Sequence, residues 1–282
     1  MFEIIFKYQF IQNAIFASLL ASIVCGIIGA VIVEKKLIMM SGGIAHTAYG
    51  GVGMGYWLGF SPMIGAVIFS LLAAFGIGIV KKKSSKNQDV FIALMWSLGM
   101  SLGVLFLSFM DSYPPNLTTY LFGSILSVTK EDVMLMLLLT VVILIVFIML
   151  FNDFKMMLFD EEFAKVVGYR TNFLNYLLLV LIALSIVILI KVVGIILVIA
   201  LLSVPAGTSS LFSKKFSNRI IISIALGAGY CLTGLFLSYI LDIASGATII
   251  ILATIVYFVS YYFSGKHKIK KELKKQKLKQ TA

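Results

Sequence analysis

Charged residues are scarce in this chain. Only 12% of its 282 residues are Asp, Glu, Lys or Arg, whereas 61% are hydrophobic and the mean hydropathy is +1.07. Soluble domains carry about 25% charged residues and about 45–50% apolar ones. This composition excludes a soluble globular protein, because a soluble fold could not bury so much apolar surface. At roughly 20 residues per span, about nine membrane spans fit within the chain and leave only short loops.

Cysteine, histidine and catalytic motifs are also scarce. Cys25 and Cys231 lie inside apolar runs, which is typical of isolated membrane thiols and not of a disulfide framework. The chain has no HExxH pair and no G-x-x-x-x-G-K-[ST] loop, so neither a zinc protease nor an ATP site of that kind is predicted. No series of carboxylates crosses the apolar runs, although a proton-coupled carrier usually needs one. We therefore predict a membrane transport protein that catalyses no reaction itself.

Apolar runs bounded by charged or turn residues predict an all-α polytopic membrane protein with about nine transmembrane helices. The predicted spans are 12–33, 42–59, 62–80, 89–110, 132–151, 173–190, 192–212, 220–241 and 247–264. They form a single transmembrane domain over 1–265, followed by a basic tail over 266–282. A short apolar piece within the connection 111–131 is too short to span and predicts a re-entrant or surface helix.

The basic residues are distributed unevenly between alternate loops. Of the 23 Lys and Arg residues, 20 lie in one set of loops and the tail, and three lie in the other set. By the positive-inside rule, the N-terminus is predicted outside and the C-terminus inside a cell membrane. The net charge of +11 is then explained by contact with anionic membrane lipid, and no nucleic-acid partner is expected.

The second predicted span, 42–59, is rich in glycine and carries one histidine. On a helix, Gly42, His46, Gly50 and Gly53 share one face, where small residues let another backbone approach closely. One interpretation is close packing around a hydrogen-bonded histidine; the other is a helix that lines a path with His46 as a metal ligand. His46 is the only clear ionisable side chain in the middle of a predicted span, and such groups by default mark functional sites.

The predicted inner loop 152–172 contains the signals of a short helix over 161–167. An acidic N-cap precedes two acids in the first turn, where the helix dipole favours them, and a glycine follows the last turn. The N-cap is Asp160, the two acids are Glu161 and Glu162, and the glycine is Gly168. Phe163 supplies an apolar side chain for docking. We interpret this segment as an amphipathic docking helix. The alternative, a helix lying on the bilayer, is disfavoured because anionic lipid repels three acids.

Pro205 lies near the inner end of the seventh predicted span. Proline removes a helical hydrogen bond, so a break or kink is predicted there, with Ser203 or Thr208 able to satisfy the freed groups. A kink that serves packing alone is the alternative interpretation.

Together these segments resemble the membrane permease of ABC importers for zinc, manganese and related divalent metals, over nearly the whole chain. In order, the matching segments are 41–51 with Ala45-His46, the outer-loop piece 120–126, the acidic motif 160–168, the seventh-span stretch 193–206, and Ser245-Gly246. In many members an aspartate stands four residues before the histidine, and here that position is Gly42. Because a carboxylate favours manganese and imidazole suits zinc, zinc is the favoured ion and manganese the next.

The resemblance implies partners that composition alone does not show. It implies a homodimer around a central path, cytoplasmic ATPase subunits that grip 161–167, and an extracellular metal-binding protein that delivers the ion. No resident cofactor is expected, because Zn or Mn is the transported substrate. Two alternatives from other classes are a secondary active transporter of a small cation or metal chelate, and an intramembrane enzyme. The first needs no docking helix, and the second needs a partner for His46 that the sequence does not identify.

Overall fold

The protein, seen in a computed structural model that describes residues 8–83, 88–110 and 121–280, is built from helices. No β-strand occurs among these residues, and the predicted all-α fold is confirmed. The helices are α2 (Gln9–Glu34), α3 (Ile38–Leu58), α4 (Pro62–Lys83), α5 (Gln88–Ser108), α7 (Lys130–Met149), α8 (Phe151–Phe159), α9 (Glu161–Val166), α10 (Thr171–Phe212), α11 (Phe216–Leu241) and α12 (Ser245–Gln280), with a short 3-10 turn, η1 (Ile125–Ser127), before α7.

Eight segments of the described chain are long and apolar enough to cross a membrane. They match eight of the nine predicted spans to within a few residues. The remaining predicted span, 42–59, is present as α3, whose 21 residues suffice for a crossing. Its glycines and His46 lower its hydropathy, and most of its residues are buried by neighbouring helices. Only the helical form satisfies every backbone group in lipid, which is why the apolar runs become helices.

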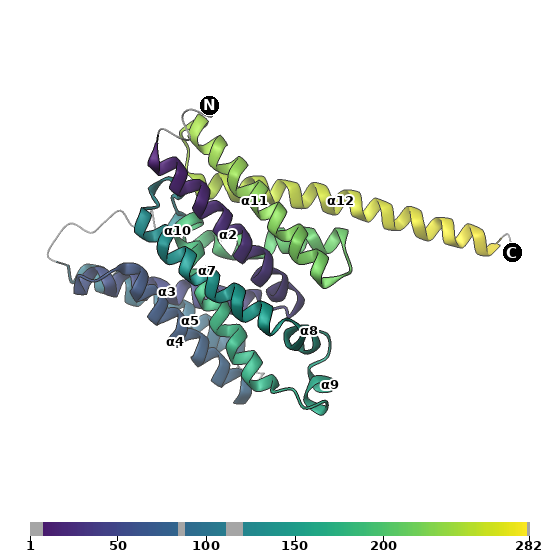
Figure 1. Cartoon of the computed structure of the whole chain (residues 1–282), viewed down its shortest axis with the longest axis horizontal. Helices are drawn as coiled ribbons and strands as arrows, with labels where there is room; N and C mark the ends of the chain where they lie inside the picture. Colours follow the sequence, from purple (N-terminus) through teal and green to yellow (C-terminus); the bar gives the residue numbers. More distant parts are fainter. Residues whose placement is uncertain (1–7, 84–87, 111–120, 281–282) are drawn as a thin grey trace.

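The helix α3 lies inside a group formed with α4 and α5, and α10 packs against it from a second side. A second group contains α2, α11 and α7, as Figure 1 shows. The helix α12 continues past the predicted span to Gln280 and extends away from the bundle. Residues 111–120, which belong to the predicted connection 111–131, lie outside the described residues.

The break in α10 lies close to the boundary between two predicted spans, 173–190 and 192–212, and away from Pro205. Pro205 lies inside continuous helix, whereas Gly194 has the non-helical dihedrals φ 78° and ψ 166°. The two spans of α10, Thr171–Ile190 and Val192–Phe212, lie on either side of this glycine. Ser203 donates to the carbonyl of Ile199 at 2.8 Å, so it does not compensate the group that proline leaves free. Glycine tolerates the positive φ at this break. The kink predicted at Pro205 stays a prediction.

Candidate functional site

His46 lies in the buried part of α3, with 7% of its surface exposed. Its ring stacks on Trp96 of α5, with centroids 4.0 Å apart and planes inclined by 19°. Its Nδ1 atom is buried and has no hydrogen-bond partner among the residues that the structure describes. A polar atom left without a partner in an apolar surrounding is unfavourable. The interpretation of His46 as a hydrogen-bonded packing residue therefore gains no support at Nδ1.

The predicted glycine face of α3 lies in tight helix contacts. A methyl group added at Gly50 would approach Phe69 Cε1 of α4 to 3.0 Å and the carbonyl oxygen of Gly99 in α5 to 3.1 Å. One added at Gly53 would meet the Gly103 backbone of α5, with its Cα at 2.9 Å. These glycines allow α3 and α5 to pack backbone to backbone. Their predicted role in lining a path stays a prediction.

Gly42 occupies a position where a larger side chain would collide with its neighbours. A methyl group there would lie 2.9 Å from Ile199 Cδ1 and 2.9 Å from Trp96 Cζ3, the same ring that covers His46. The bulk of Trp96 thus stands where the resemblance places an aspartate side chain. Among the described residues, no group of three or more His, Cys, Asp or Glu residues could hold a metal ion.

The predicted short helix is present as α9, and its ends form as expected. Asp160 is the N-cap, and its Oδ1 accepts a hydrogen bond of 2.9 Å from the backbone N–H of Phe163. At the other end, Gly168 has φ 100°, a left-handed conformation that ends the helix. Local sequence signals are sufficient here because both ends depend on residues within one turn.

The helix α9 turns its apolar side chains outward. Phe163 is 53% exposed and Val166 is 85% exposed, and the neighbouring Phe159 is also exposed, as is the acid Glu162. Exposed apolar side chains gathered on one small helix are typical of an interaction site. We name the group Phe159, Glu162, Phe163, Val166 and Val167 the α9 surface.

Glu161 points the other way, into the bundle. Its Oε2 atom accepts from Lys35 Nζ at 2.8 Å, and its Oε1 atom accepts from Asn175 Nδ2 at 2.8 Å. Lys165, one turn along α9, lies 3.7 Å from Oε1. Burial alone would raise the pKa of Glu161, but the bonds from Lys35 and Asn175 and the charges of Lys35 and Lys81 lower that pKa below its usual value. Sequence reasoning grouped Glu161 with the docking acids and missed this inward role.

Three glycines from distant segments meet at the end of the bundle opposite α9. Gly123, with φ 72°, lies against the backbone of Val193 and Gly194, and Gly194 faces Gly123 in return. Gly246, at the start of α12, faces the carbonyl oxygens of Phe122 and Val193. The Ser245 hydroxyl accepts a 3.1 Å bond from the Ile125 N–H. We name this contact of Gly123, Gly194 and Gly246 the glycine junction.

The chain is similar to known transport proteins over almost its full length. Residues 7–264 match the ABC 3 transport family. The chain is 40% identical over 257 residues to an uncharacterized membrane protein of Synechocystis sp., covering 91% of this chain and 92% of that protein. It is 34% identical over 264 residues to the manganese transport system membrane protein MntC of Listeria monocytogenes, covering 94% of each. The solved structure of PsaBC from Streptococcus pneumoniae in complex with Fab matches with a TM-score of 0.84 at 32% identity, over 92% of this chain and 94% of that one.

Proposed function

Because the chain belongs to the ABC 3 transport family and is the multi-pass permease of a metal ABC importer in the cell membrane, we propose that it carries Mn²⁺ along a path past His46. The observation that carries this proposal is the buried Nδ1 of His46, which lacks a partner among the described residues. A neutral imidazole nitrogen is a metal ligand. An ion passing this point would supply the partner that the described residues do not.

The choice of manganese is based on the relatives. The Listeria protein is named for manganese transport, and the zinc preference expected from the sequence finds no support among the relatives. A site with one imidazole and few other ligands binds weakly, and weak binding suits transport, because an ion must leave as well as enter. Backbone carbonyls or water would complete the coordination.

The partners follow from the exposed surfaces. We assign the α9 surface to cytoplasmic ATPase subunits, because Phe163 and Val166 would bury apolar area in such a contact. An extracellular metal-binding protein would deliver the ion at the end of the bundle that holds the glycine junction. A second copy of the chain would add a second His46 to the path. A secondary active transporter, the alternative function, would have no ATPase subunit to bind the α9 surface.

Metal uptake by a His46→Ala permease tests the proposal. The permease, its ATPase and its binding protein are expressed together in cells that lack other manganese importers, and Mn²⁺ and Zn²⁺ uptake are measured separately. We expect His46→Ala to lower Mn²⁺ uptake about tenfold, because one ligand bond of ordinary strength is lost. Protein yield and ATPase retention should not change, since alanine suits a helix.

Thr140→Ala in α7 is the matched control. The Thr140 side chain is as buried as that of His46, and its Oγ1 atom also lacks a hydrogen-bond partner among the described residues. Its replacement should leave uptake near the wild-type level. Normal Mn²⁺ uptake by a well-folded His46→Ala permease would remove His46 from the path. Uptake of Zn²⁺ in preference to Mn²⁺ by the wild type would reverse the choice of ion.

A further inference from the structure

The inward side of α9 contacts the corner between α2 and α3, the helix that carries His46. We propose that Glu161 is a positioning residue that transmits movement of α9 to α3 through its ion pair with Lys35. This inference rests on the proposed function, because it assumes that an ATPase moves α9. It adds one thing: the residue pair through which the movement reaches the metal path.

The ion pair is placed to persist while α9 moves. The Lys35 side chain is 11% exposed and that of Glu161 is 33% exposed, so both charges are partly withdrawn from water. Separating them would leave the Lys35 ammonium nearly buried and unpaired, which is strongly unfavourable. A displacement of α9 is therefore more favourable with Lys35 following than with the pair broken.

Lys35 lies at a corner that is too tight to absorb such a displacement. It is the capping residue that follows α2, and α3 begins three residues later. Lys36 has φ 57°, and the Leu37 N–H donates to the Ile32 carbonyl at 2.9 Å, which closes the turn. His46 lies eight positions beyond the first residue of α3, or about 12 Å at the helical rise. A shift at Lys35 thus reaches His46 through rigid helix.

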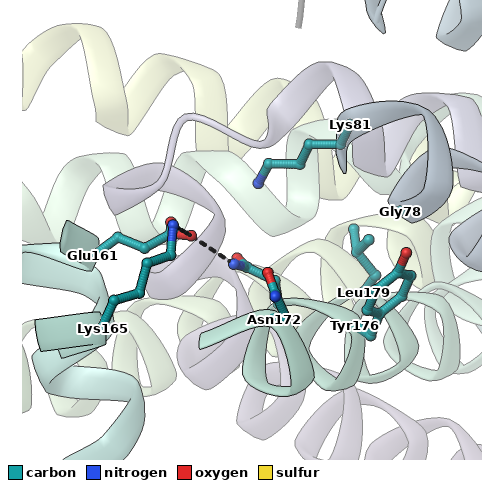
Figure 2. A pocket seen from close by; sticks show the side chains of 8 residues that line it. Gly78, Lys81, Glu161, Lys165, Asn172, Tyr176 and Leu179 are labelled. Atoms are coloured by element: carbon teal, nitrogen blue, oxygen red, sulfur yellow. Dashed lines mark hydrogen bonds and ion pairs between the residues drawn. The ribbon is translucent and has the colours of Figure 1, made fainter. Parts of the chain in front are cut away.

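The surroundings of Glu161 leave room for the movement. Figure 2 shows Glu161 and Lys165 on one side of a cavity of about 250 Å³, with Lys81 of α4 extending from the far side. Asn172 and Tyr176 of α10 also line it. Toward α4, therefore, α9 meets a cavity and not a packed wall.

A double-mutant cycle in the complete transporter tests the transmission. Glu161→Gln keeps the amide contact with Asn175 and removes the charge, Lys35→Met removes the other charge, and the third variant carries both changes. We expect each single change to lower metal uptake about tenfold, and the double change to lower it no further, because both remove one interaction. ATP hydrolysis and retention of the ATPase subunit should stay at wild-type levels, so the ATP used per ion rises about tenfold.

Two matched changes control for charge. Glu131→Gln and Lys214→Met alter exposed residues on α7 and in the loop before α11, and should leave the ATP used per ion unchanged. A double variant about 100-fold impaired would show that the two residues act independently and would refute the transmission. Loss of the ATPase from Glu161→Gln would refute it as well, because Glu161 would then only orient α9 for docking.

Failure of the proposed function would look different. Val166→Asp changes the α9 surface and leaves Glu161 and Lys35 in place, so it should release the ATPase whatever the ion pair does. Retention of the ATPase by Val166→Asp, or absence of metal uptake by the wild type, would overturn the proposed function. A wild type that transports, with single variants that also transport normally, would overturn the transmission alone.

Discussion

Alanine at Gly123 should destabilise the permease far more than alanine at a glycine of the same backbone conformation. Gly123 has φ 72° and Gly59 has φ 74°, so an L-residue is strained by about 1–2 kcal/mol at either position. Around Gly59, no described atom lies within 4 Å of the new methyl group. At Gly123 the methyl group would meet the Val193 and Gly194 backbone, which cannot rotate away as a side chain can. Overpacking typically adds about 1–3 kcal/mol.

The two variants therefore form a matched pair. Gly59→Ala should cost about 1–2 kcal/mol, which is the backbone strain alone. Gly123→Ala should cost about 2–5 kcal/mol, the sum of strain and overpacking. Detergent-solubilised permeases are heated in parallel, and the fraction that stays monodisperse is measured against temperature. Gly123→Ala should lose its monodisperse peak at a clearly lower temperature than Gly59→Ala. Equal thermal shifts for the pair would refute the close contact at the glycine junction.

Three further predictions concern the α9 end, the orientation and pH. Phe163→Asp should release the ATPase subunit in a pull-down while membrane insertion stays normal, because a charge would enter an apolar contact; retention of the subunit would contradict this. In intact cells, an impermeant thiol reagent should label Ala244→Cys and spare Ser217→Cys, and the opposite pattern would reverse the orientation. The pKa of the Glu161 carboxyl is lower in the folded protein than its ordinary value of 4.5. The ion pair with Lys35 therefore stabilises the fold fully above about pH 4.5, and this stabilisation is lost as the pH falls further. The thermal stability of wild type relative to Glu161→Gln should therefore shrink only below that pH, and a constant difference would refute the assignment.

The spans could be predicted from the sequence because the bilayer removes alternatives. A run of about 20 apolar residues has no other way to satisfy its backbone in lipid, so length and hydropathy suffice. The helix α3 shows where this argument weakens. Its hydropathy is lower than that of the other eight spans. It is recognised as a span only through its length and its place between two charged or polar boundaries. Packing against α4, α5 and α10 compensates for its glycines.

The ends of α9 could be predicted, but the direction of Glu161 could not. Asp160 and Gly168 act within one helical turn, and their residue types are specific for helix ends. The direction of Glu161 depends on Lys35, which is 126 positions away in the chain. A single sequence contains no signal for that contact, since an acid in the first turn of a helix already has a local explanation.

The sequence divided α10 into two spans at the right place, but it did not identify Gly194 as the residue at which the helix is interrupted. Proline is the strongest local signal against a helix, so Pro205 attracted the prediction. In the structure the chain departs from helix at Gly194, where Gly123 and Gly246 leave space for the reversal. Three glycines acquire their meaning only when the fold brings them together, although their surrounding motifs were each noticed in the sequence.

The first half of α10 joins two features of the fold, the contact with Glu161 and the glycine junction. Asn175, near its start, donates to Glu161, and Gly194, at its end, lies in the glycine junction. Gly194 lies 19 positions after Asn175, a distance of about 29 Å at the helical rise. The helix α10 as a whole also packs against α3. Glu161 thus contacts both the corner that leads into α3, at Lys35, and the start of α10, at Asn175. The junction itself is a close backbone contact, in which glycines at positive φ let two helical segments meet where any side chain would collide.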